Sequence, residues 1–188
     1  MNAATAQTSA PQLTPGEVDN LYEVVNGEVV ELEPMGAFDT ALASELAFFL
    51  RLFAREHAMG LVVTETLFVL DAALNLRRRP DAAYVSYGRW PEQSVPRAAA
   101  WNVVPDLAVE VVSPTNIVDK VDEKIVEYFA AGVQLVWAIY PETERIYVYA
   151  SANDVKILER SETLNGGEVL PAFELSIDTL FSGLSKPE

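Results

Sequence analysis

Hydrophobic and polar positions recur along this chain with two different periods. Apolar residues three and four positions apart predict one helix from Thr40 to His57 and a second helix that ends at Gly132. Shorter runs rich in valine, tyrosine and phenylalanine predict strands. These strands cover residues 21–32 around the hairpin signal Asn26-Gly27, then 61–70, 82–87, 105–112, 134–140 and 144–150, with a further strand at 154–160 and a strand and helical turn at 173–181. Glycines and prolines mark 88–102 and 165–167 as loops.

The order of these elements predicts the fold class. A hairpin, a helix, three strands, a second helix and two further strands are typical of an α/β sheet that is backed by helices. The chain has 188 residues, half of them hydrophobic, and we expect a single domain over residues 17–188. Residues 1–16 are small, polar and interrupted by prolines, so we expect a flexible tail there.

Composition excludes several classes of protein and site. The net charge of −15 argues against a protein that coats nucleic acid, although a local patch with a bound metal ion could still grip it. The absence of cysteine excludes disulfides, zinc-thiolate sites and cysteine nucleophiles. One histidine, His57, leaves no histidine cluster for zinc and argues against a Ser-His-Asp triad. Neither a signal peptide nor a membrane-spanning apolar run is visible, and we expect a cytoplasmic protein.

One carboxylate stands among apolar side chains in the strand at residues 105–112. Burying Glu110 without a partner would cost several kcal/mol, so it needs a cation, a metal ion or a proton. In the helix that follows, Lys124 falls between Val121 and Tyr128 on the apolar stripe. Glu110 and Lys124 are therefore both expected to face inward. They form either an ion pair that holds the helix to the strand or part of a reactive site.

Asp81 is a second acid that can reach this place. It precedes the strand at 82–87, and it lies beside Glu110 if the two strands pair antiparallel. Asp106 shares a strand with Glu110 but lies roughly 13 Å away at about 3.3 Å per residue, which is too far to share an ion easily. Carboxylates on neighbouring strands suit Mg²⁺ or Mn²⁺, and a nearby lysine can orient water or stabilise charge at a phosphate. Asp81, Glu110 and Lys124 thus form a candidate hydrolytic set, unless Asp81 is only a solvated strand end.

Two further features have a functional and a plain interpretation. Arg77, Arg78 and Arg79 come just before Pro80-Asp81. Such a run is usually a solvated surface segment, and its position beside a strand-start aspartate adds contact with phosphate as a second interpretation. Any contact with nucleic acid is expected to use these arginines, since the general surface is acidic. Glu65, on the strand before Asp81, is either a further metal ligand or a side chain that faces solvent.

Three segments together resemble a known family: RPDAAYVS, then PDLAVEVVSP, then KVDEKIVEYFAAGVQLVWAIYPETERIYVY. The pattern is similar to the Uma-two family of restriction-endonuclease-like proteins, which belongs to the PD-D/E-x-K nuclease superfamily. The resemblance runs from about Tyr22 to Phe181. It implies a restriction-endonuclease-like fold, in which a mixed sheet is flanked by helices, with metal-binding acids at Asp81 and Glu110.

The chain departs from the superfamily pattern at one position that matters for catalysis. The superfamily has lysine two residues after the second acid, where this chain has Val112. The resemblance implies that Lys124 takes that role from the next helix, with Lys120 as a weaker and more exposed candidate. The family also commonly has a histidine near the start of its first helix, where this chain has Phe38-Asp39-Thr40, which puts any role of that position in doubt.

The expected function is that of a metal-dependent DNA endonuclease, in which a water activated by Mg²⁺ or Mn²⁺ attacks the phosphodiester. Two alternatives remain open: a catalytically silent nuclease-fold module that binds a protein or a nucleic acid, and an enzyme that acts on another phosphoester. We also expect a homodimer, because cutting both strands of a duplex needs two sites and most soluble oligomers are two-fold symmetric. The aromatic content, including Trp90, Trp101 and Trp137, leaves room for an interface.

Overall fold

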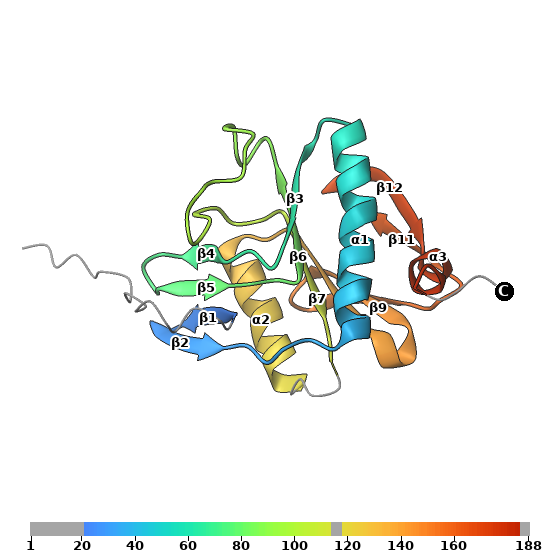
Figure 1. Cartoon of the computed structure of the whole chain (residues 1–188), viewed down its shortest axis with the longest axis horizontal. Coiled ribbons are helices and arrows are strands. Elements are labelled where there is room, and N and C mark those ends of the chain that lie inside the picture. The colour runs from blue at the N-terminus through green and yellow to red at the C-terminus, as the bar shows by residue number, and fades with distance from the viewer. Residues whose placement is uncertain (1–20, 114–117, 185–188) are drawn as a thin grey trace, which may run out of the picture.

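A six-stranded mixed sheet forms the centre of the protein (Figure 1). The computed structural model describes residues 21–113 and 118–184, and the tail predicted for residues 1–16 lies outside these ranges. The strand order is β10-β9-β8-β7-β6-β3, and β7 and β8 run parallel while the other neighbours are antiparallel. The strands are β3 (Gly60–Thr64), β6 (Ala82–Ser86), β7 (Leu107–Val111), β8 (Leu135–Tyr140), β9 (Arg145–Ser151) and β10 (Asp154–Leu158).

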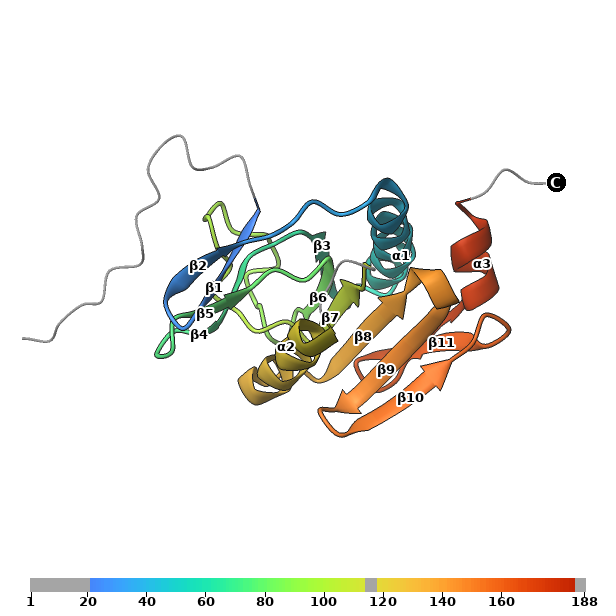
Figure 2. The same cartoon turned by 90° about the horizontal axis from the view of Figure 1, so that it is seen from below.

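Helices cover both faces of this sheet (Figure 2). On one face lie α1 (Ala37–Glu56), the hairpin of β11 (Thr163–Gly166) and β12 (Leu170–Ser176), and α3 (Ile177–Ser182). On the other face lies α2 (Val118–Ala131), whose Val121, Ile125 and Tyr128 are buried. Because side chains alternate along β7, Leu107, Val109 and Val111 point to the α1 side, while Ala108 and Glu110 point to the α2 side. The face under α2 therefore contains the buried carboxylate.

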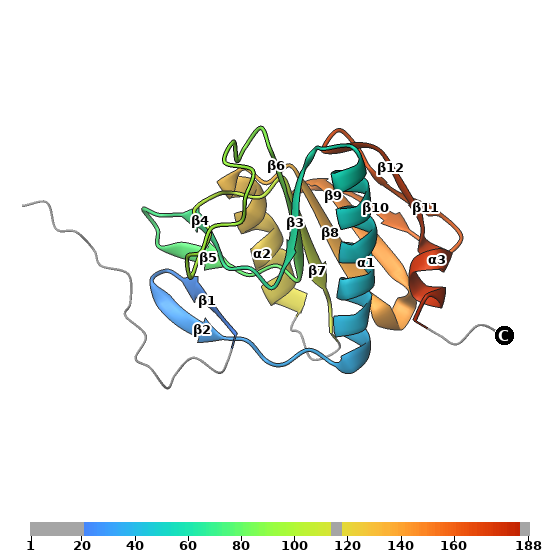
Figure 3. The same cartoon turned by 45° about the horizontal axis from the view of Figure 1, so that its top comes forward.

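A second, four-stranded sheet lies beside α2 (Figure 3). Its order is β2-β1-β5-β4, with β1 (Tyr22–Val25), β2 (Glu28–Glu31), β4 (Phe68–Asp71) and β5 (Leu76–Arg78). The predicted hairpin at Asn26-Gly27 is present, and both residues have the positive φ angles, 52° and 83°, that a type I′ turn requires. Pairing of Val24 with Arg77 then joins the N-terminal hairpin to the segment that leads to Asp81.

Most elements follow the hydrophobic pattern, and the predicted class, an α/β sheet flanked by helices, is confirmed. The first helix begins at Ala37 rather than Thr40, and His57 caps it. The second ends at Ala131, just before Gly132 with a φ of +101°. A 3-10 turn at Pro141–Thr143 joins β8 to β9. No helix in the two described ranges is long and apolar enough to span a membrane.

Two predictions of local structure were wrong. Residues 61–70 do not form one strand but contribute β3 to the large sheet and β4 to the small one. The chain breaks between them at Glu65, whose φ of 49° lies in the left-handed region, so Glu65 is not on a strand. Residues 165–167 were expected to be loop, but Asn165 and Gly166 complete β11, because they pair with β12.

Candidate active site

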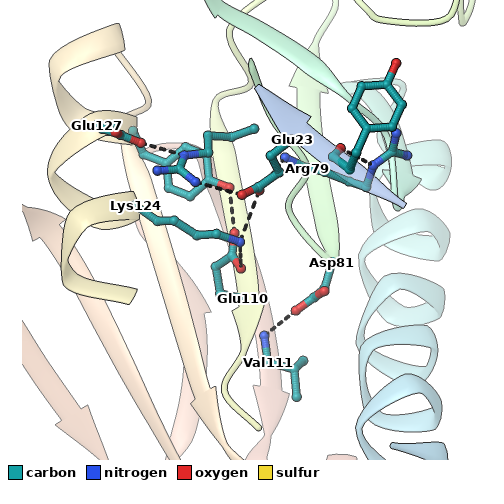
Figure 4. A network of polar contacts seen from close by, with 10 residues as sticks. Glu23, Arg79, Asp81, Glu110, Val111, Lys124 and Glu127 are labelled. Carbon is teal, nitrogen blue, oxygen red and sulfur yellow. Dashed lines mark hydrogen bonds and ion pairs between the residues drawn. The ribbon is translucent and has the colours of Figure 1, made fainter. Parts of the chain in front are cut away.

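Asp81 and Glu110 lie side by side because β6 and β7 pair antiparallel. The register matches Ala82 with Val109, which sets Asp81, one residue earlier, beside Glu110, one residue later. The backbone N–H of Val111 donates to Oδ2 of Asp81 at 2.5 Å (Figure 4). Asp106 lies at the other end of β7, where it pairs with Arg89 at 2.7 Å and accepts the N–H of Ser86. The strands therefore bring two of the three acids together.

Glu110 is 6% exposed, and donors from α2 reach both of its carboxylate oxygens. Nζ of Lys124 is 2.9 Å from Oε2, and the hydroxyl of Tyr128 donates to Oε1 at 2.6 Å. Lys124 and Tyr128 lie four residues apart, and so on the same face of the helix. The helical spacing predicts that Lys124 faces inward, and in the structure it does so and contacts Glu110 directly.

Glu23 is a member of the site that sequence reasoning missed. It lies in β1, it is 1% exposed, and its Oε1 is 3.1 Å from Nζ of Lys124. It also accepts the backbone N–H of Arg79 at 2.9 Å and the guanidinium of Arg78 at 2.7 Å. Glu23 stands among apolar residues of a predicted strand, as Glu110 does, but nothing in the local pattern indicates Lys124 as its partner. The docking of the whole hairpin, rather than any motif, brings Glu23 to Lys124 (Figure 4).

The three arginines do not form a solvated charge run. Arg78 is 6% exposed and pairs with Glu23 and Glu127, the latter at 2.5 Å. Arg79 is half-buried and donates to the backbone carbonyls of Tyr22 and Glu65. Arg77 is also half-buried, and its Nε has no hydrogen-bond partner among the described residues. Both ion pairs of Arg78 are internal, so its guanidinium is already engaged by side chains of the protein itself.

A small cavity of about 100 Å³ opens onto these groups. It is lined by Glu65, Asp81, Glu110 and Lys124, with Arg79 and the segment Leu32–Met35 at its side. Although Glu65 is not on a strand, its N–H donates to the carbonyl of Asp81 at 3.3 Å, which keeps it at the cavity. The structure therefore places Glu65, Asp81, Glu110 and Lys124 around one space.

Burial and mutual repulsion dominate the electrostatics of the acids. Burial, reinforced by the charge of Glu110, raises the pKa of Asp81 well above its ordinary value. Burial also raises the pKa of Glu110, even though Lys124 opposes the shift, and burial raises the pKa of Glu65. Glu23 behaves in the opposite way: burial works against its charge, but Lys124 and Arg78 outweigh it and lower its pKa.

Lys124 is held in its charged form by its two carboxylates. Burial disfavours the ammonium, but Glu110 and Glu23 together raise the pKa of Lys124 above its ordinary value. The ammonium has three N–H donors, and the two carboxylates account for two of them. Among the contacts of the described residues, one donor is thus left for a further group.

The donor set fits a hard divalent cation. Five carboxyl groups (Glu23, Glu65, Asp81, Glu110 and Glu127) lie near three cationic side chains (Arg78, Arg79 and Lys124), so the acidic groups outnumber the cations by two. No three acidic or histidine groups in the described ranges converge closely enough to hold a metal ion by themselves. Magnesium does not require that, since it commonly binds one or two carboxylates and keeps waters or phosphate oxygens as its other ligands.

Solved structures include a protein whose fold is similar to that of this chain. A search of curated proteins gives no match. A crystal structure described as "a putative nuclease belonging to DUF820" from Anabaena variabilis ATCC 29413 superposes with a TM-score of 0.75 at 20% sequence identity, covering 86% of this chain and 89% of that chain. The two chains therefore share a fold, and the expected mixed sheet flanked by helices is that of a nuclease-fold neighbour.

A family model tests the resemblance that the sequence suggested. The model for Uma2, described as "Putative restriction endonuclease", matches residues 12–178. This match covers most of the chain, including β1 with Glu23, β6 and β7 with the acids, and α2 with the lysine. The protein therefore belongs to the Uma2 family.

Proposed function

We propose that this protein is a metal-dependent endonuclease that hydrolyses phosphodiester bonds of DNA. The observation that carries the proposal is the convergence on one cavity of Asp81, which precedes β6, Glu110 of β7 and Lys124 of α2. The description of the Uma2 family and that of the Anabaena neighbour agree with a nuclease. Asp81 and Glu110 would hold Mg²⁺ or Mn²⁺, with Glu65 as a further ligand directly or through water.

Each residue has a task that its surroundings suit. A cation bound there would act as a Lewis acid on the phosphate and lower the pKa of a bound water. Lys124 would direct its remaining donor at that water or at a phosphate oxygen, where negative charge develops. Tyr128, which donates to Oε1 of Glu110, fixes the orientation of that carboxylate. Valine at position 112 cannot replace the lysine, because it carries no charge and no donor.

Contact with the nucleic acid has to overcome the charge of −15. We propose that Arg79, which lines the cavity, and Arg77 contribute to phosphate binding, while Arg78 keeps its buried ion pairs. A bound dication would add to this local attraction and offset the surplus of carboxylates. Binding is therefore expected to be weak without metal and sensitive to salt.

Incubation of the purified protein with plasmid DNA and Mn²⁺ tests the proposal. We expect nicked and linear plasmid to accumulate, and EDTA to stop the reaction. The Asp81→Asn variant should cleave about 10²-fold more slowly or worse, because it loses a charged ligand. Glu123→Gln is the matched control, since Glu123 is exposed on α2 and should leave cleavage unchanged. Cleavage that persists in EDTA or in Asp81→Asn would contradict the assignment.

Metal binding can be measured without any cleavage. Calorimetric titration with Mn²⁺ should show weaker binding by Glu110→Ala than by the wild type, because one of the two proposed carboxylate ligands is gone. Glu123→Gln should again resemble the wild type. Equal Mn²⁺ affinity in the wild type and in Glu110→Ala would remove Glu110 from the metal site.

A specific observation favours a second candidate, a silent nuclease-fold module that binds a protein or a nucleic acid. Both oxygens of Glu110 already accept hydrogen bonds, from Lys124 and Tyr128, and an ion pair of this kind can be purely structural. Under this alternative, Mn²⁺ neither binds at the cavity nor supports cleavage. The calorimetric titration and the plasmid assay together separate it from the endonuclease.

We propose further that the protein acts as a homodimer, since a double-strand cut needs two sites. Trp101 and Trp137 cannot contribute to the interface, contrary to the expectation from the sequence, because they are 1% and 0% exposed. Exposed apolar residues include Phe48 and Leu52 on α1, which are each 54% exposed and one turn apart. Light scattering at micromolar concentration should give twice the chain mass of 20.7 kDa. A mass of one chain would contradict the dimer.

A further inference from the structure

Lys124 is shared between two carboxylates that come from distant parts of the chain. Glu110 comes from β7 in the large sheet, and Glu23 comes from β1 in the small one. We infer that Glu23 is a positioning residue, which holds the ammonium of Lys124 at the cavity when Glu110 is engaged by another partner. The inference rests on the proposed function, since it concerns the lysine of that same site.

The contacts of Glu23 fix its carboxylate in one orientation. Oε1 accepts from Lys124 at 3.1 Å and from the N–H of Arg79 at 2.9 Å, and Oε2 accepts from Arg78 at 2.7 Å. Two of these three donors belong to side chains and one to the backbone that leads into β6. The carboxylate cannot turn without breaking at least one of these bonds, and it is 1% exposed, so water cannot replace the bond lost.

A second ion pair ties this arrangement back to the same helix. Arg78 links Glu23 to Glu127, which lies on α2 three residues after Lys124 and so near it on the helix surface. The contacts form a closed ring from Lys124 through Glu23 and Arg78 to Glu127 and along α2 back to Lys124 (Figure 4). Two points of attachment on one helix face restrict both its rotation and its sliding along the sheet.

The chemistry of the site gives this second carboxylate a purpose. A lysine that serves the reaction must stay in place while Glu110 also binds a cation. That cation would repel the ammonium, and Glu110 alone could not retain both. Glu23 lies on the other side of Nζ, and nothing in the proposed reaction requires it to move. Its ion pair with Nζ at 3.1 Å would therefore keep Lys124 in place.

The test compares two carboxylates that share Arg78 but differ in their contact with Lys124. Glu23→Gln keeps the size and one acceptor oxygen but removes the charge beside Nζ. Glu127→Gln, the matched control, removes the other partner of Arg78 and leaves the ion pair between Glu23 and Lys124 in place. Two quantities are measured in both variants and in the wild type. The first is the rate at which an amine-acetylating reagent labels Lys124, followed by mass spectrometry with exposed Lys120 as internal standard. The second is kcat and KM for plasmid cleavage.

If Glu23 positions the lysine, acetylation of Lys124 becomes several-fold faster in Glu23→Gln and stays slow in Glu127→Gln. Glu23→Gln should also lose kcat by about 10- to 100-fold with little change in KM, because a misplaced catalytic group lowers turnover rather than binding. Equal acetylation of Lys124 in Glu23→Gln and in the wild type overturns the inference, and so does an equal effect of the two variants.

Two cases need a separate readout: a Glu23→Gln protein that does not fold, and a wild type that cleaves no DNA. If Glu23→Gln does not fold, the double variant Glu23→Gln/Arg78→Gln removes one buried charge of each sign and is labelled in the same way. Faster acetylation of Lys124 in that protein supports the inference, and unchanged acetylation overturns it. If the wild type cleaves no DNA, the endonuclease proposal fails, but acetylation of Lys124 still decides whether Glu23 holds it. If the wild type cleaves DNA and Glu23→Gln keeps the full kcat, the endonuclease proposal holds. The positioning role of Glu23 is then contradicted.

Discussion

Replacing Lys124 by methionine is expected to lower the turnover of DNA cleavage by about 10²-fold or more, which is the effect of losing one positioned electrostatic group. The change also leaves two buried carboxylates, Glu23 and Glu110, without their shared cation. Breaking a buried ion pair from one side commonly costs about 3–5 kcal/mol, so the melting temperature should fall as well. Turnover is measured at a temperature at which circular dichroism shows the variant folded.

Lys120→Met is the matched control for this experiment. Lys120 lies on the same helix one turn earlier, and its side chain is exposed. Its removal should change neither turnover nor melting temperature. A folded Lys124→Met protein that cleaves at the rate of the wild type would show that the lysine is structural and that another group serves the reaction.

Replacing Arg78 by alanine should destabilise the protein by about 3–5 kcal/mol, because Glu23 and Glu127 lose their common partner. The neighbouring Arg77→Ala should cost less than about 1 kcal/mol, since its side chain is half-buried and makes no ion pair among the described residues. Urea denaturation of the two variants side by side measures this difference. Equal stabilities would mean that the ion pairs of Arg78 contribute nothing net.

The same result bears on how DNA binding is studied. A variant that replaces Arg77, Arg78 and Arg79 together would combine lost phosphate contacts with lost folding, so weaker binding by that protein would have no clear cause. Arg77→Ala and Arg79→Ala, tested separately with Arg78 intact, avoid the problem. Only Arg79 lines the cavity, and its substitution should have the larger effect on binding.

Much of the fold could be predicted because its signals are local. Asn26-Gly27 sets a turn through its own backbone preferences, and the spacing of Val121, Lys124 and Tyr128 places the lysine on the inner face of its helix. The position of Asp81 needed one further assumption, that β6 and β7 pair antiparallel, and this is the pairing found. Asp81, Glu110 and Lys124 could therefore be brought together by one strand pairing and one helical spacing.

The parts that could not be predicted depend on long-range packing. Glu23 enters the site because the hairpin that contains it docks against β5, where it meets Arg78, 55 residues later in the sequence. Hydrophobic periodicity within either strand does not indicate this contact. Three consecutive arginines look like surface, but Arg78 turns inward because two carboxylates from distant elements meet it there. The sequence also gives no signal for the break between β3 and β4 at Glu65, because residues with left-handed backbone angles are usually glycine or asparagine, not glutamate.

The placement of Lys124 and Tyr128 on α2 has a consequence for the way in which the chain acquires its native structure. Glu110 lies on the face that α2 covers, so its carboxylate stays hydrated until the helix docks. Docking of α2 removes this water, and α2 also carries the ammonium of Lys124 and the hydroxyl of Tyr128, which replace it as hydrogen-bond donors. Dehydration of the carboxylate and its neutralisation are thus one event. Folding need not pass through a state in which a bare charge is already enclosed, which would be the costliest state on the route.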